Sequence, residues 1–292
     1  MNSFLSALGT KLAEKWLASL VLPGLLFVGC GLAAILLSPD RPFDAKEVVI
    51  RATDTSERIS RTSVTAVVLS VIALALAATA SALTAQGAGF LARHVWQGKW
   101  PRSLARQLTK WRRNRWNDAD ETLAVAIHEG LADADARDDL AWARNRIALS
   151  YPRRPTWIGD RLLGADIRVW HSYGLDLAAV WPRLWILMNE VARGEITAAH
   201  GAYIKAATLA GWGMLYTLLG LLWWPATPVG AGVLVLAWSR ARAAAALLAD
   251  AIEASVDLNA RALAIQLGAL ADGDNFTRQC GEHVTQLLRK GT

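Results

Sequence analysis

The most distinctive stretch of the sequence, residues 151–188, contains charged side chains that could form a binding site. Arg161, Arg168, Asp176 and Arg183 could form a site for an anionic ligand or a lipid headgroup, because guanidinium groups bind carboxylate and phosphate oxygens through paired hydrogen bonds. The alternative is structural: Asp176 would cap a helix or pair with an arginine. The sequence alone leaves both interpretations open.

Patterns typical of catalysis are missing from the sequence. There is no GxSxG, HExxH or GxxxxGK[ST] motif, and the five histidines are scattered along the chain. Two GxGxx[GA] matches begin at Gly29 and Gly87, but neither follows a strand, as dinucleotide binding requires. Cys30 lies in an apolar run and Cys280 in the tail, so they do not form a redox pair. We therefore expect no enzymatic activity, no catalytic residue and no cofactor.

An acidic cluster could be imagined as a metal site. It comprises Asp133, Asp135, Asp138 and Asp139, with His128 and Glu129 nearby. Their spacing does not place them on one face of a helix. We therefore predict a solvated acidic surface and no bound metal.

A basic, tryptophan-rich stretch occupies residues 94–116, and no acid interrupts it. Tryptophan is enriched at membrane interfaces, and Lys and Arg bind anionic lipid headgroups. Nucleic-acid binding through phosphate contacts and stacking is the alternative, which we do not expect beside a membrane span. The predicted headgroup-binding residues are Arg102, Arg106, Lys110, Arg112, Arg113 and Arg115.

Three long uncharged runs dominate the composition. They cover residues 16–37, 62–92 and 206–239 in a chain that is 53% hydrophobic and only 19% charged. A membrane helix needs about 20 apolar residues. The third run is long enough for a hairpin with its turn at 223–228, and its last span is either tilted or continues beyond the membrane as one helix. Core helices of a soluble protein are the alternative, although uncharged runs of this length are unusual there.

Basic residues set the predicted orientation. The 93–205 segment holds eighteen Lys and Arg and the tail after residue 239 holds six, whereas the hairpin turn holds none. The positive-inside rule then places both termini and the 93–205 segment in the cytoplasm. A cleaved signal peptide ending near Cys30 is the alternative for the first run, but that run stays apolar for too long.

The sequence therefore predicts an all-α polytopic membrane protein with about four transmembrane helices in two hairpins and a helical cytoplasmic domain. Residues 1–92 would hold an N-terminal interfacial helix and the first hairpin, and residues 93–205 a basic, Trp-rich cytoplasmic helical domain. Residues 206–239 would form the second hairpin, and residues 240–292 a cytoplasmic amphipathic helix and tail.

Small residues recur every four positions in the second run. Ala73, Ala77, Ser81, Ala85 and Gly89 would let a neighbouring helix backbone approach closely. That neighbouring helix could belong to the same chain or to another copy, and the spacing alone does not decide between the two. We expect a homo-oligomer. The spans contain no Asp, Glu, Lys, Arg or His, which argues against a proton-coupled transporter. Their hydroxyl groups could line a narrow pore or bond to backbone carbonyls.

Helix signals also occur outside the apolar runs. Acids from Asp118 onward are expected at a helix N-terminus, before the stripe Leu123, Ile127, Leu131 and Ala134. Thr156 is a predicted cap for a helix from Trp157 to about Trp170 that Tyr173-Gly174 ends, and Asp176 is a predicted cap for the next helix.

The tail from Ala241 to Leu270 is a predicted amphipathic helix. Its apolar stripe must pack on another surface. The 118–150 segment is the expected partner, and a second subunit is the alternative. The stripe consists of Leu248, Ile252, Val256, Leu263, Leu267 and Leu270.

Residues 151–184 resemble a signature of uncharacterised bacterial integral membrane proteins. The resemblance is carried by the residues Tyr151-Pro152, Pro155-Thr156, Gly159-Asp160-Arg161, Tyr173-Gly174-Leu175-Asp176 and Trp181-Pro182-Arg183-Leu184. It implies two membrane hairpins around a cytoplasmic segment in the bacterial inner membrane, and no activity.

We therefore expect a non-enzymatic membrane scaffold or regulatory protein that acts through its cytoplasmic helices. Its expected partners are anionic membrane lipids, further copies of itself and a cytoplasmic protein. The alternative is a homo-oligomeric ion channel or membrane-permeabilising effector, whose layout of two hairpins would be analogous to that of bestrophin-type channels.

Overall fold

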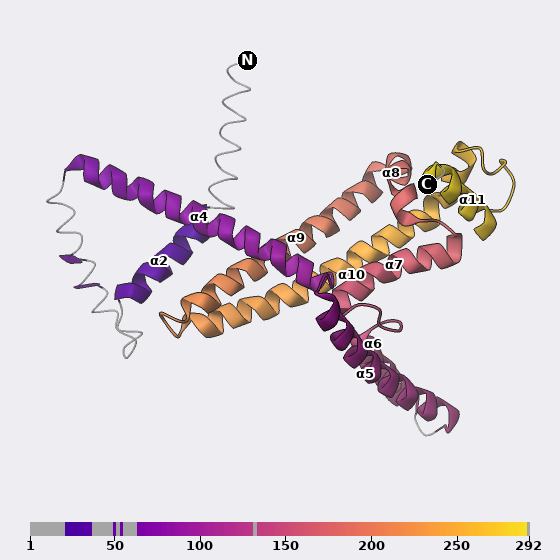
Figure 1. The fold of residues 1–292 in the computed structure, drawn as a ribbon, viewed down its shortest axis with the longest axis horizontal. Helices are drawn as coiled ribbons and strands as arrows, with labels where there is room; N and C mark the ends of the chain where they lie inside the picture. The colour runs from indigo at the N-terminus through magenta and orange to yellow at the C-terminus, as the bar shows by residue number, and fades with distance from the viewer. Residues whose placement is uncertain (1–20, 37–48, 51–52, 55–62, 131–132, 291–292) are drawn as a thin grey trace, which may run out of the picture. The chain divides into compact units, whose positions relative to one another are not determined.

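The computed structural model describes residues 21–36, 49–50, 53–54, 63–130 and 133–290, so the predicted N-terminal interfacial helix and most of the first loop lie outside these residues. The described residues form helices and no strand, which confirms the predicted all-α class (Figure 1). The chain divides into two compact units, one of residues 1–92 and 205–238 and one of residues 93–204 and 239–292. The helices are α2 (Leu22–Leu36), α4 (Val64–Trp96), α5 (Arg102–His128), α6 (Ala134–Ile147), α7 (Trp157–Tyr173), α8 (Leu177–Leu187), α9 (Glu190–Leu219), α10 (Ala226–Gln266) and α11 (Arg278–Arg289).

Helix α4 exposes a long apolar surface in the first unit. Only 11% of its most apolar stretch is buried, and large side chains such as Val64, Leu69 and Leu76 are exposed. Two described helices, α4 and α10, are long and apolar enough to cross a membrane, while α2 is apolar but shorter. The structure therefore supplies two candidate spans where the sequence predicts about four.

Glycines let the helices of the first unit approach each other closely. A β-carbon at Gly24 of α2 would overlap the Ala78 carbonyl of α4. A β-carbon at Gly211 of α9 would likewise overlap the Ala85 carbonyl. These contacts place α2 and α9 against α4 within one chain, as small residues permit in membrane helices.

The predicted stripe of small residues on α4 is split between two environments. Ala85 and Gly89 are buried, whereas Ala73 and Ala77 are exposed and Ser81 is half-buried. The reason is geometric: an α-helix has 3.6 residues per turn, so a step of four residues advances by about 40° around the axis. Over four such steps the stripe moves to another side of the helix.

The second hairpin is formed by α9 and α10, which Figure 1 shows as two antiparallel arms. Residues 220–225 form the turn, slightly before the predicted position. Gly230 of α10 lies against the Thr217 backbone, where a β-carbon would clash. Helix α10 then continues to Gln266 without a break, so the last predicted span and the predicted amphipathic tail are one helix.

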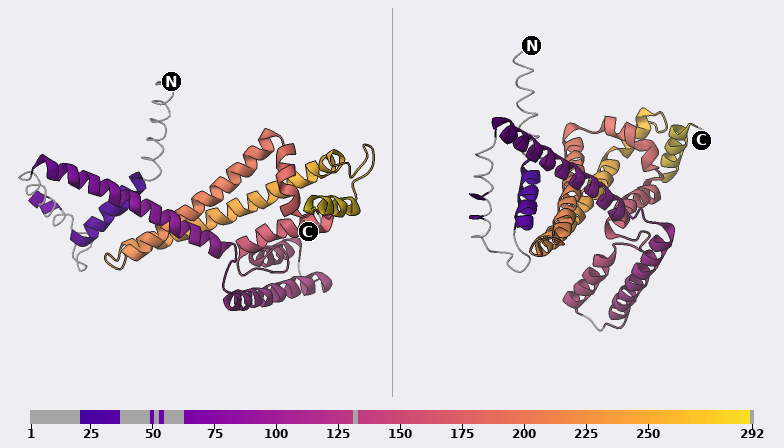
Figure 2. Two further views of the ribbon diagram at one scale, coloured as in Figure 1. Left: turned by 45° about the horizontal axis from the view of Figure 1, so that its top comes forward. Right: turned by 60° about the vertical axis from the view of Figure 1, so that its left-hand side comes forward.

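In the second unit, α5 and α6 lie side by side as a helical hairpin (Figure 2). The prediction of a helix that opens at Asp118 is wrong, because α5 begins at Arg102, directly after Pro101. The basic stretch continues the helical pattern, with Thr109 and Arg112 buried on the same helix as Leu123. The acids expected at a helix N-terminus therefore lie in the middle of α5.

The predicted caps of α7 and α8 are confirmed. The Thr156 hydroxyl accepts a hydrogen bond from the Gly159 amide, and Gly174 ends α7 with a left-handed backbone at φ +66°. Glycine adopts this conformation without a steric penalty. The Asp176 carboxylate accepts from the Ala178 amide at the start of α8.

The core of the second unit gathers around α10. Val256 and Leu263 are buried there with Val169 of α7, Leu184 of α8 and Val284 of α11. The remaining residues of the predicted tail stripe pack on or within this core. The stripe therefore packs on α7, α8 and α11, and not on the 118–150 segment as predicted.

Candidate functional site

A ladder of polar contacts joins α7 to α10. Arg161 pairs with Asp250, and Arg168 holds both carboxylate oxygens of Glu253, with Nε donating to Oε2 at 2.8 Å. One further rung is the Tyr173 hydroxyl, which donates to Asp257 at 2.8 Å. Because residue numbers rise along both helices from rung to rung, α7 and α10 run parallel to each other, as Figure 1 shows.

A buried ion pair joins α5 to the start of α7. Arg112 pairs with Asp160, and the two side chains are only 9% and 13% exposed. Arg112 also donates to the Ile147 carbonyl at 2.6 Å. The other Asp160 oxygen accepts from the amides of Arg153 and Arg154, at 2.8 and 2.6 Å. This pair is fully hydrogen-bonded, which is what a buried charge needs.

Asp176 joins the start of α8 to α11. Its second carboxylate oxygen accepts from both Arg289 Nε and Nη2, at 3.1 and 2.6 Å. The hydrogen bond from Arg289 lowers the pKa of Asp176 below its usual value, against an opposing effect of burial. Thr285 of α11 adds a bridge, because its hydroxyl donates to the Gly174 carbonyl and accepts from the Asp176 amide.

The four residues of the predicted ligand site therefore have separate partners. Arg161 and Arg168 contact α10, Asp176 contacts α11, and Arg183 donates to the Ala179 carbonyl of its own helix at 3.2 Å. Of the four, Arg161 and Arg168 line one hollow. Asp176 and Arg183 are not among its lining residues.

The predicted headgroup-binding residues also differ from one another. Arg112 is occupied inside the chain, and half-buried Arg113 donates to the Pro152 carbonyl at 2.8 Å and lies over the Tyr151 ring. The remaining residues of the set are exposed on α5. They are Arg102, Arg106, Lys110 and Arg115.

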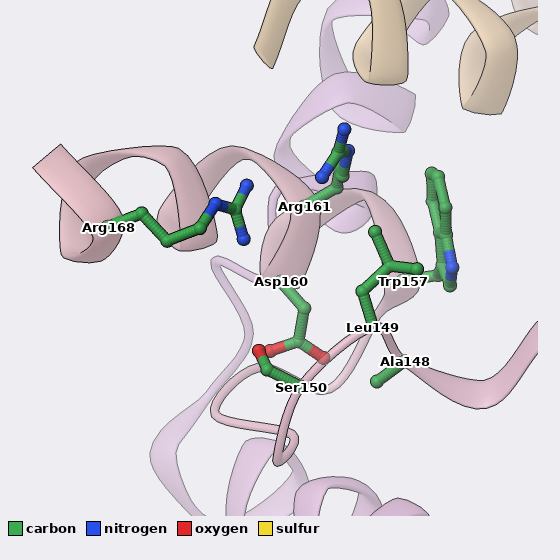
Figure 3. Close-up of a pocket in the computed structure, with 7 residues that line it drawn as sticks. All are labelled: Ala148, Leu149, Ser150, Trp157, Asp160, Arg161 and Arg168. Atoms are coloured by element: carbon green, nitrogen blue, oxygen red, sulfur yellow. The ribbon is translucent and has the colours of Figure 1, made fainter. Parts of the chain in front are cut away.

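The hollow lies between the 148–150 segment and the N-terminal half of α7 (Figure 3). It is small, with a cavity volume of only about 10 Å³, and is lined by Trp157, Asp160, Arg161 and Arg168 together with Ala148, Leu149 and Ser150. In Figure 3 the Asp160 carboxylate points toward Ser150, while the Arg161 side chain points the other way.

Two arginines beside this region were not predicted from the sequence. The Arg242 guanidinium lies 4.3 Å from the centre of the Trp157 ring, and that of Arg146 lies 4.7 Å from the centre of the Trp142 ring. Arg146 and Trp142 are four residues apart on α6, so their contact is local to that helix. Arg242 follows an apolar run, and only the fold brings it to Trp157 at the start of α7.

Among the residues that the structure describes, no group of His, Cys, Asp and Glu side chains could hold a metal ion. Both GxGxx[GA] matches lie inside helices, at Gly29 in α2 and Gly87 in α4. The chain matches no protein-family model, no curated protein and no solved structure. The resemblance carried by residues 151–184 stays a prediction.

Proposed function

We propose that this chain is a bacterial inner-membrane protein with about four transmembrane helices and with both termini in the cytoplasm. The observation that supports this most strongly is the exposure of α4, whose most apolar stretch is only 11% buried. Apolar surface in water costs roughly 25 cal/mol per Å², so an exposed helix of this composition needs another solvent. The acyl chains of a bilayer would provide it.

Within the membrane, we propose a non-enzymatic scaffold or regulatory role rather than a channel. The α4 hydroxyls that could line a pore bond within their own helix. Ser81 Oγ donates to the Ala77 carbonyl and Thr84 Oγ1 to the Ala80 carbonyl, both at 2.8 Å. Ser70 and Thr79 donate in the same way. A hydroxyl that is occupied in this way cannot donate its proton to a passing anion or water, and only its oxygen lone pairs stay available as acceptors.

The helical second unit is the proposed acting part. Contacts of α7 and α8 with α10 and α11 bring distant segments of the chain together in one surface. Such a surface suits the binding of a cytoplasmic protein partner. The exposed bases of α5, including Arg102, Arg106 and Lys110, would contact anionic lipids at the membrane surface. Association with further copies of the chain belongs to the same proposal.

Ion flux from liposomes that contain the purified chain tests the scaffold proposal against the channel. We expect no flux from protein that is folded and inserted. Ser81→Leu is the informative variant, because Ser81 is half-buried, and Ser70→Leu is its control on the exposed part of α4. Flux that Ser81→Leu abolishes and Ser70→Leu leaves unchanged would contradict the scaffold and establish a channel.

A further inference from the structure

The α5–α6 hairpin carries its charges in two separate blocks. Residues 102–115 hold six Lys and Arg and no acid, whereas residues 118–139 hold eight Asp and Glu and a single Arg. Helix α5 runs from the first block into the second, and α6 begins within the second block. Of these acids only Asp120 is half-buried, in its pair with Arg144, and the others are exposed. The hairpin is therefore acidic at its turn and basic at the start of α5.

One side of α5 stays exposed next to the side that is buried in the hairpin. Four residues on it follow one another at intervals of seven, which is close to two helical turns, so they share this side. They are Leu104, Trp111, Asp118 and Val125. Leu104 and Val125 are exposed, and Trp111 is 56% exposed. Apolar residues at heptad intervals are typical of a helix that packs on another helix.

We call this side of α5 the seam and include in it Leu108 and Arg115, which continue the same spacing. Arg115 and Asp118 lie three residues apart in the seam, and neither forms an ion pair with any residue that the structure describes. The Arg115 guanidinium lies 4.9 Å from the centre of the Trp111 ring, which holds it over the apolar part of the seam. The seam thus presents a positive group, a negative group and apolar side chains.

We propose that the seam binds the seam of a second copy of this chain, with the two α5 helices antiparallel. This inference rests on the association of copies in the proposed function and names the surface responsible. In an antiparallel pair with two-fold symmetry, Arg115 of each copy faces Asp118 of the other. In the same register, Leu108 of each copy faces Val125 of the other.

Charge complementarity favours a second copy and this direction. Antiparallel pairing places the basic block of each hairpin beside the acidic block of the other, whereas parallel pairing would bring like charges together. Two hairpins paired in this way form a four-helix bundle in which neighbouring helices are antiparallel, a common arrangement of helical hairpins. The Trp111 side chains would become buried in this bundle, and tryptophan is enriched among the residues that dominate binding energy at protein interfaces.

This pairing is compatible with the proposed lipid contacts. Arg106 lies two residues after Leu104, about 200° further around the helix axis, so the bases proposed to contact headgroups and the seam occupy different sides of α5. Those lipid contacts place α5 along the membrane surface. A two-fold axis along the membrane normal reverses a helix in that position, so two copies in one membrane can pair through the seam.

Cross-linking tests the pairing in membranes that contain the full chain without its native cysteines. The seam pair is Leu108→Cys with Val125→Cys. These positions are seventeen residues and thus about 25 Å apart on one helix, so a short bismaleimide joins them only between copies. The control pair is Arg106→Cys with Ala124→Cys, both exposed on another side of α5. The control for direction is Leu108→Cys alone, which parallel helices would bring next to itself.

We expect a cross-linked dimer from the seam pair and none from the two controls. Cross-linking of the single variant to the same extent as the seam pair would mean that the helices are parallel or collide at random. Equal cross-linking of the control pair would mean that another side of α5 is the interface. Either result, or no dimer from any variant, would overturn the proposal.

Exchange of the two seam charges is the second test, with self-association of the full chain measured by sedimentation in mild detergent. Arg115→Glu or Asp118→Arg alone places like charges opposite each other in the dimer, and each should weaken self-association about tenfold. The two substitutions together recreate opposite charges and should restore it. Arg106→Glu is the matched control on the other side of α5 and should associate as the original chain does. Circular dichroism shows whether each variant is folded.

The result of the exchange separates this inference from the proposed function. If the single variants associate as the original chain does, the seam is overturned while the association of copies stands. If the original chain is monomeric, both are contradicted. If the single variants lose binding to anionic lipid vesicles and keep their self-association, the seam faces lipid and not a second copy.

Discussion

The guanidinium of Arg112 on α5 pairs with the carboxylate of Asp160 on α7, in a place where both side chains are almost excluded from solvent. The two residues are 48 positions apart in the chain, so this contact fixes the α5–α6 hairpin to the ladder of α7 and α10. Carbonyl groups and amides around the pair satisfy its other hydrogen-bonding groups. The pair is thus a structural joint built from a residue that the sequence predicts to bind lipid.

Removal of Asp160 should be far more damaging than removal of Glu282. Asp160→Ala leaves Arg112 buried without its partner, which costs about 3–5 kcal/mol in the free energy of unfolding. In the pair of Arg278 and Glu282 the side chains are 50% and 41% exposed, so Glu282→Ala should cost about 0–1 kcal/mol. Denaturant unfolding followed by circular dichroism in mild detergent measures both. Equal losses for the two variants would show that Arg112–Asp160 is not the buried joint.

Two glycines of α9 should respond in opposite directions to alanine. At Gly211 a β-carbon meets the Ala85 carbonyl, so Gly211→Ala must separate α9 from α4 and should lower the free energy of unfolding by about 1–3 kcal/mol. Nothing lies within 4 Å of a β-carbon at Gly201. Gly201→Ala should therefore stabilise the helix by about 0.5–1 kcal/mol. A neutral Gly211→Ala, measured by thermal unfolding, would contradict the close approach of α4 and α9.

The contact of Asp176 with Arg289 should depend on pH. Because Arg289 lowers the pKa of Asp176 in the folded chain, the stabilisation is present above the ordinary Asp pKa of about 3.9 and is lost as the pH falls through the lower folded value. Asp176→Asn keeps an oxygen to cap α8 and removes the charge. The difference in unfolding temperature between the original chain and this variant should be constant near neutral pH and should vanish in acid. A difference that is unchanged in acid would rule out the carboxylate as its source.

Local signals predicted the ends of helices correctly where a single residue decides them. Thr156, Gly174 and Asp176 act through the backbone groups next to them, so their roles follow from residue type and position. The predicted helix start at Asp118 was wrong, because α5 begins at Arg102. A run of basic residues and tryptophans suggested an interfacial segment, although nothing in it prevents a helix after Pro101.

The partners of the charged residues were beyond the reach of sequence reasoning. Arg161 and Asp250 are 89 positions apart, and Arg168 and Glu253 are 85 apart. Ion pairs between residues so far apart in the chain depend on which helices lie side by side. Here α7 lies beside α10, and the sequence does not indicate that neighbour. The apolar stripe of the tail predicted correctly that one face of this helix is packed. It did not predict that the face packs on α7, α8 and α11.

The most direct test of the central claim is whether lipid covers α4. In a chain without its native cysteines, a cysteine at position 76 (Leu76→Cys) replaces a side chain that is 65% exposed, and Asn114→Cys on α5 is the exposed control. In native membranes, a water-soluble maleimide should label the control and leave position 76 unlabelled until detergent and denaturant are added. A lipid-soluble maleimide should label both from the start. Equally rapid labelling of both positions by the water-soluble reagent would mean that α4 faces water, and would contradict a membrane-spanning role for this helix.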